Sequence, residues 1–73
     1  MTKEQLYTAI ENANERALAV ANEIRDIEAN YSGDELAQKL EEIKFLRIQD
    51  VLVGEESVKD NVVTLCDMIG ENG

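Results

Sequence analysis

A seven-residue repeat of apolar and small residues runs through the first half of this chain. Its positions alternate at spacings of four and three residues, and they are Leu6, Ile10, Ala13, Ala17, Val20, Ile24, Ile27 and Tyr31. A period of about 3.5 residues keeps one stripe of a helix facing its neighbours, so the repeat predicts a helix that packs along its whole length. We call these residues the heptad stripe. No proline or glycine interrupts it, which predicts one helix over about residues 3–30, roughly 42 Å long.

Cap and turn residues divide the remainder into two shorter helices. Thr2 with Gln5 matches a capping box at the start of the first helix, and Ser32 with Glu35 matches a second one. The next helices are predicted over about 34–52 and 55–69, with a break at Gly54. Gly70 is the expected stop of the last helix. Residues 51–53 also fit a short strand, although nothing obvious would pair with it. The predicted fold is therefore an all-α bundle in one domain, residues 1–73.

The small size of the chain limits how this bundle is stabilised. With 73 residues a single core is marginal, and one cysteine with no histidine leaves neither an internal disulfide nor the usual zinc frameworks. The second and third helices are too short to cover a 42 Å helix, roughly estimated from its rise per residue. The lengths therefore favour a homodimer or higher oligomer, in which the interface between chains is formed by Leu6, Ile10, Ala13, Ala17, Val20, Ile24 and Ile27.

Three positions carry more specific expectations. Residues 43–53 are apolar nearly all round, which predicts burial from more than one side. Arg47 falls on the apolar stripe of the second helix, where it either marks the end of that stripe or reaches an acid of a neighbouring chain. Asn14 lies beside the heptad stripe and could hydrogen-bond across helices to set their register.

No group of residues matches a known catalytic, cofactor or metal site. A calcium loop beginning at Asp26 would need glycine where Tyr31 stands and glutamate where Ala37 stands. A di-iron bundle needs histidines, which the chain lacks. Adjacent acids such as Glu41 and Glu42 point about 100° apart on a helix and do not converge on one substrate. Cys66 is expected to be a small core residue. We therefore expect no enzymatic activity, cofactor or metal.

The net charge of −9, from 16 acids and 7 bases, is the clearest surface property. It opposes direct binding to nucleic acid or to an anionic membrane, and favours either solubility alone or a basic protein partner. No apolar run approaches the about 20 residues of a membrane span, and no secretory signal is visible. We expect a cytoplasmic protein.

The leading functional hypothesis is an acidic helical protein–protein interaction module. It would act as an accessory inhibitor or adaptor on a basic partner, and in its sharpest form its carboxylates would mimic a nucleic acid backbone. Small acidic helical proteins of this kind are frequent among phage accessory proteins, which is an association only. The alternatives are a structural homo-oligomer with no outside target and a binder of small ligands between chains. The candidate partner surface consists of Tyr7, Leu18, Glu11 and Glu15.

Overall fold

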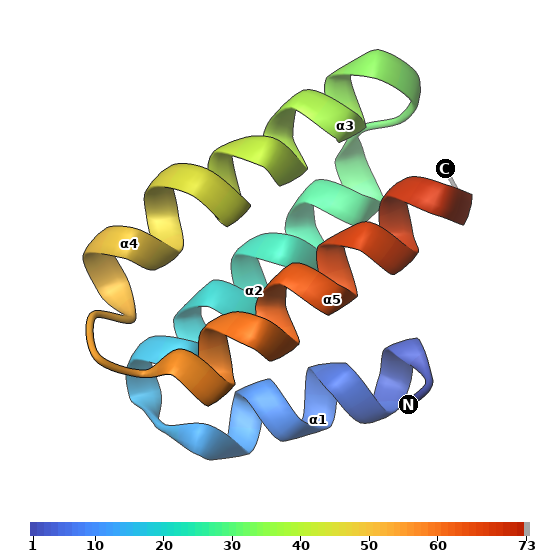
Figure 1. Cartoon of the computed structure of the whole chain (residues 1–73). Helices are drawn as coiled ribbons and strands as arrows, with labels where there is room; N and C mark the ends of the chain where they lie inside the picture. Colours follow the sequence, from blue (N-terminus) through green and yellow to red (C-terminus); the bar gives the residue numbers. More distant parts are fainter. Residues whose placement is uncertain (73) are drawn as a thin grey trace.

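Helices make up nearly all of the chain in the computed structural model, which describes residues 1–72 apart from the Asn72 side chain (Figure 1). In chain order they are α1 (Lys3–Ala13), α2 (Glu15–Asn30), α3 (Gly33–Glu42), the π-helical turn η1 (Ile43–Arg47), α4 (Ile48–Val51) and α5 (Glu56–Asn72). The segments α3, η1 and α4 follow one another without a break, and we call them the α3–α4 rod. The described residues contain no strand, so the all-α prediction is confirmed and residues 51–53 end a helix.

The single helix predicted over residues 3–30 is wrong, because the chain breaks at Asn14. This residue has extended backbone angles, φ −172° and ψ 178°, and its side-chain oxygen accepts a hydrogen bond from the backbone N–H of Ala17 at 2.9 Å. Asparagine is among the best residues for capping a helix N-terminus and a poor one inside a helix. Its side-chain amide also donates to the Glu55 carboxylate. The expected cross-helix bond therefore exists, but it holds a turn between two antiparallel helices.

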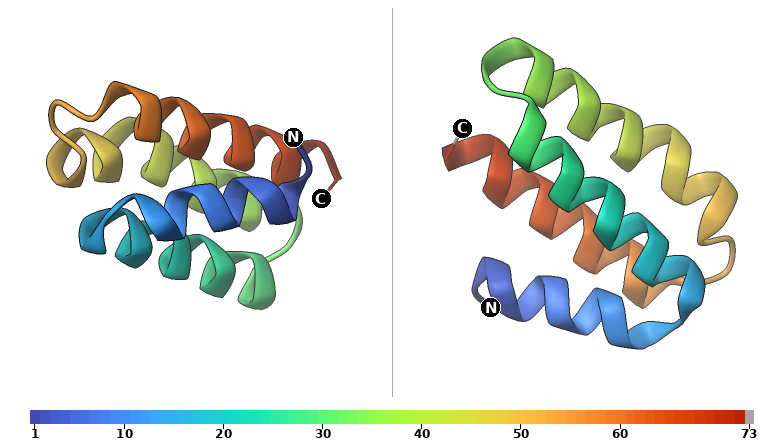
Figure 2. Two further views of the ribbon diagram at one scale, coloured as in Figure 1. Left: turned by 90° about the horizontal axis from the view of Figure 1, so that it is seen from below. Right: turned by 180° about the vertical axis from the view of Figure 1, so that it is seen from behind.

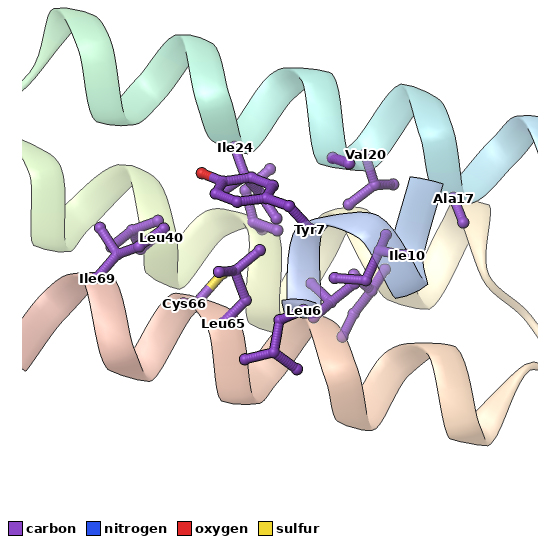
Figure 3. Close-up of a cluster of buried hydrophobic side chains, with 14 of the residues drawn as sticks. Leu6, Tyr7, Ile10, Ala17, Val20, Ile24, Leu40, Leu65, Cys66 and Ile69 are labelled. Atoms are coloured by element: carbon purple, nitrogen blue, oxygen red, sulfur yellow. The ribbon is translucent and has the colours of Figure 1, made fainter. Parts of the chain in front are cut away.

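The hairpin formed by α1 and α2 closes around one core with the other helices. Helix α1 contacts α2 and α5, and the α3–α4 rod contacts α2 and α5 from the other side (Figures 1 and 2). The Cα radius of gyration is 11.0 Å, close to the value of about 11 Å for a compact chain of this length. Apolar side chains from all of these elements meet in the interior (Figure 3), and the most deeply buried large ones are Leu6, Tyr7, Ile10, Val20, Ile24, Ile48, Leu52, Val62 and Leu65.

The π-helical turn η1 changes which side of the α3–α4 rod faces the core. Ile43 and Ile48 are both buried although they are five residues apart. In a regular helix Arg47, four residues after Ile43, would point inward. A π-turn adds one residue to the helix, so Ile48 takes the core position and Arg47 turns outward.

As a result, the expectation that residues 43–53 are buried from several sides is wrong. The relative exposures of Phe45, Leu46 and Val53 are 65%, 65% and 67%. None of the described helices is long and apolar enough to cross a membrane.

The helix ends agree with the sequence in part. The capping box of Thr2 and Gln5 is present, with hydrogen bonds of 2.8 and 3.2 Å. The second capping box is wrong, because Ser32 makes no side-chain cap and α3 begins with Gly33 at φ 59°. Gly70 does not stop the last helix either, since α5 continues to Asn72. A single glycine costs a helix about 1 kcal/mol, which packing of the same helix can offset.

Candidate functional site

The residues predicted to join two chains lie mostly inside one chain. Leu6, Ile10, Ala17, Val20 and Ile24 are at most 1% exposed. Ile27 is partly buried against the same core, whereas Ala13 is exposed at the end of α1. In this fold the heptad stripe is therefore occupied by contacts within the chain. The stripe is a correct sign of helix packing, but its partner helices belong to the same molecule.

The candidate partner surface of Tyr7, Leu18, Glu11 and Glu15 does not form one free face. Tyr7 is fully buried, so its assignment to a partner surface is wrong. Glu11 accepts a hydrogen bond from Arg25 Nε at 3.1 Å. Leu18, 40% exposed, and Glu15 do present exposed side chains on α2.

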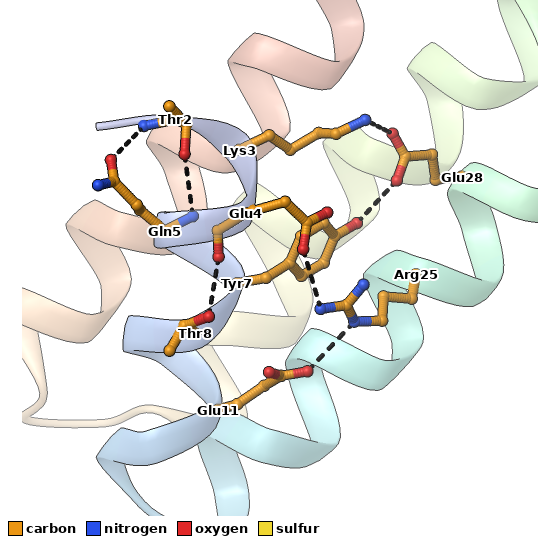
Figure 4. Close-up of polar contacts among 9 residues, drawn as sticks. All are labelled: Thr2, Lys3, Glu4, Gln5, Tyr7, Thr8, Glu11, Arg25 and Glu28. Carbon is orange, nitrogen blue, oxygen red and sulfur yellow. Dashed lines mark hydrogen bonds and ion pairs between the residues drawn. The ribbon is translucent and has the colours of Figure 1, made fainter.

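Tyr7 instead lies at the centre of a polar group that fastens α1 to α2, drawn in Figure 4. The Tyr7 hydroxyl donates to Glu28 Oε1 at 3.1 Å, and Lys3 Nζ is 2.7 Å from Glu28 Oε2. The Arg25 guanidinium carbon lies 4.0 Å from the centre of the Tyr7 ring. Burial, reinforced by the negative charge of Glu28, raises the pKa of Tyr7. We call this group, completed by Glu4 and Glu11, the Tyr7 cluster.

Arg47 joins α2 to the α3–α4 rod. Its guanidinium donates to both carboxylate oxygens of Glu23, with Nη2 at 2.6 Å from Oε1. The acid that Arg47 reaches belongs to its own chain, so the hypothesis of a neighbouring chain is not needed for this pair. The regular spacing of the apolar stripe does end at Arg47, because the next buried residue is Ile48.

A cleft of about 440 Å³ lies between α2 and the α3–α4 rod, and we call it the rod cleft. The two bases at the cleft are already engaged: Arg47 pairs with Glu23, and Lys39 Nζ lies 5.4 Å from the centre of the Tyr31 ring. The cleft therefore combines an apolar lining with an excess of negative charge. Its lining residues are Glu23, Asp26, Ile27, Tyr31, Lys39, Glu42, Ile43, Leu46, Arg47 and Asp50.

One of the two most exposed apolar side chains of the rod, Leu46, belongs to this cleft. Phe45 precedes Leu46 on the same π-turn but does not line the cleft, and its ring centre lies 5.5 Å from Lys44 Nζ. The carboxylate of Glu42, also at the cleft, makes no hydrogen bond or ion pair with another described residue. Sequence reasoning missed this surface because it assumed a regular helix. One signal was present: Arg47 on an apolar stripe, followed directly by Ile48.

Cys66 has the role expected of a core residue. It is 1% exposed, and burial raises the pKa of its thiol to about 12, so the reactive thiolate is scarce at neutral pH. Over residues 1–72 no group of three or more histidine, cysteine, aspartate or glutamate side chains is placed to hold a metal ion.

Comparison with protein-family models, curated proteins and solved structures found no match to this chain.

Proposed function

We propose that this protein is a non-enzymatic cytoplasmic interaction module that binds a basic, amphipathic segment of another protein at the rod cleft. The observation that carries the proposal is the 65% exposure of Leu46, which stands on a π-turn and lines an acidic cleft. Large apolar side chains exposed next to a groove are typical of protein-binding surfaces. Turns of π-helix also occur frequently at functional sites.

The charge of the cleft selects the chemistry of the partner. The lining contains Glu23, Asp26, Glu42 and Asp50 against two bases, of which Arg47 pairs with Glu23 and Lys39 lies over the Tyr31 ring. A lysine or arginine of a partner would find favourable charge there, and an acidic segment would be repelled. The partner segment we propose therefore places an apolar side chain on Leu46 and a basic one between the carboxylates.

Energy and selectivity come from different parts of this surface. Burying an exposed leucine contributes about 1.5 to 3 kcal/mol, whereas an exposed ion pair contributes about 0.2 to 1 kcal/mol. Leu46 is then the main source of affinity, and the acids set the sign of the partner's charge and the salt dependence.

The test uses a synthetic helical peptide of leucine and lysine and a matched peptide of leucine and glutamate. We expect the basic peptide alone to bind, with contacts mapped by NMR shifts to Leu46 and Glu42. Leu46→Ser should weaken binding by about tenfold or more. Val53→Ser is the matched control, because Val53 is equally exposed but does not line the cleft.

Charge variants separate this proposal from nucleic-acid mimicry spread over the whole surface. Glu42→Gln should weaken binding and Glu15→Gln should not, since Glu15 lies on α2 outside the cleft lining. Equal effects of the two variants, together with no effect of Leu46→Ser, would contradict binding at the cleft and support a diffuse acidic surface.

A further inference from the structure

The heptad stripe keeps its phase through the break between α1 and α2. Ala13 and Ala17, on either side of Asn14, are four residues apart, as the repeat requires. If residues 13–15 were helical, Leu6 and Ile10 would continue the stripe of α2. The break contains one extended residue and neither proline nor glycine. The pattern of the sequence would therefore also fit one straight helix over residues 3–30.

Asn14 holds the hairpin closed against this alternative. Its side chain caps Ala17 and bonds to Glu55, which precedes α5. The hairpin leaves the last carbonyls of α1 and the first amides of α2 without partners inside a helix, whereas a straight helix would pair them. Both conformations thus have compensating hydrogen bonds, and the two bonds of the Asn14 side chain belong to the hairpin alone.

Helix α1 also covers a surface that would accept the same helix from elsewhere. It buries three side chains, Leu6, Tyr7 and Ile10, against α2 and α5. The Tyr7 cluster adds polar pairs between α1 and α2 only. If α1 straightens, this face is uncovered in its own chain. The α1 of a second copy is complementary to it, because it has the same sequence as the helix that left.

We propose that the face of α2 and α5 beneath α1 also binds α1 of a second copy of this chain, giving a domain-swapped dimer in which residues 3–30 of each copy form one straight helix. Exchange of an identical element re-forms the same contacts between chains. The main free-energy cost of the dimer is therefore the entropy of association. This proposal is independent of the rod cleft.

Two variants at Asn14 distinguish the effect of helix propensity at this position from the effect of losing the asparagine side chain. Asn14→Ala and Asn14→Gly both remove the bonds to Ala17 and Glu55. Alanine favours the straight helix, whereas glycine favours the break and is the better helix cap. Because a dimer contains two hinges, we expect the dimerisation constant of Asn14→Ala to exceed that of Asn14→Gly by about 30-fold or more. Analytical ultracentrifugation over a concentration series measures both.

A distance measurement identifies the dimer as a swapped one. Nitroxide labels on cysteines at positions 8 and 29, both exposed, would be about 32 Å apart along one straight helix and roughly half as far apart across the hairpin. The buried Cys66 thiol, whose pKa is raised, would not compete for the label. Diluting labelled chains with unlabelled ones keeps the measurement within one chain. The Asn14→Ala dimer should show the long distance.

Two results would overturn the proposal: Asn14→Ala staying as monomeric as Asn14→Gly, or an Asn14→Ala dimer that keeps the short distance. If Asn14→Ala fails to fold by circular dichroism, the unmutated sequence carrying the two labels is refolded from urea at millimolar and micromolar concentration. The swap then predicts a dimer with the long distance at the higher concentration alone, and monomer at both concentrations would contradict it.

Discussion

Single residues decide several features of this fold through their environment. Asn14 is a weak helix former beside a continuous apolar stripe, and only its cap to Ala17 and its bond to Glu55 show it to be a turn. Tyr7 lies next to that stripe in the sequence, yet it is fully buried because α2 and α5 close over it. Its hydroxyl reaches Glu28 and so remains hydrogen-bonded, as a buried polar group must be to avoid a large cost.

Tyr7→Phe tests the contribution of this hydroxyl. We expect a loss of about 1 kcal/mol in the free energy of unfolding, because one hydrogen bond disappears while Glu28 keeps its ion pair with Lys3. Tyr7→Ala should cost about 3 to 5 kcal/mol through the cavity it leaves. Urea denaturation followed by circular dichroism measures both. Tyr31→Phe is the control and should change little, since the Tyr31 hydroxyl makes no hydrogen bond within residues 1–72.

At the scale of elements, the π-turn η1 explains which side chains of the α3–α4 rod are buried and which are exposed. Leu36, Leu40 and Ile43 follow the spacing of a regular helix, and the spacing of five to Ile48 requires an extra residue. The cost of a π-turn is balanced by placing Ile48 in the core and Arg47 against Glu23. The same insertion leaves Phe45 and Leu46 in solvent.

Deleting Leu46 tests whether η1 is an insertion. The deletion shortens the spacing between Ile43 and Ile48 to four, so the rod should become a regular α-helix with stability within about 1 kcal/mol of the parent. Deleting Gln38 is the control, because it rotates Leu36 about 100° away from the remaining core positions and should cost several kcal/mol. Urea titrations report both values. Equal losses in the two deletions would mean that η1 is an integral part of the fold.

At the scale of the whole molecule, all helices share one core, so the titration of any buried group is coupled to global unfolding. A cysteine thiol ordinarily loses its proton with a pKa near 9.0. Burial raises the pKa of Cys66 to about 12 in the folded chain. The pKa of Tyr7 is likewise raised above 10.0 by burial and by Glu28. In both cases the folded state favours the protonated form.

Stability should therefore fall on the alkaline side. Below pH 9 both groups are protonated in the folded and unfolded chains and have no effect. Above about pH 9 the unfolded Cys66 ionises first, and the free energy of unfolding should fall by up to about 1.4 kcal/mol per pH unit until the folded pKa is reached. Tyr7 adds a second loss above about pH 10. In Cys66→Ala the fall should begin one pH unit higher, as urea titrations from pH 8 to 11 would show. An unchanged onset would contradict the account of Cys66.

The sequence by itself determined the helical class, the first capping box, the three-part division near residues 31–34 and 53–55, and the burial of most of the heptad stripe. Those features depend on local propensity and on periodicity, which a sequence expresses directly. Tertiary structure alone decided the break at Asn14, the burial of Tyr7 and the π-turn beside the rod cleft. Each of these depends on which helices meet. Folding α1 back onto α2 and α5 buries more apolar surface than a straight helix could bury within one chain. Burial of Ile48 in the core likewise outweighs the cost of departing from regular helix geometry.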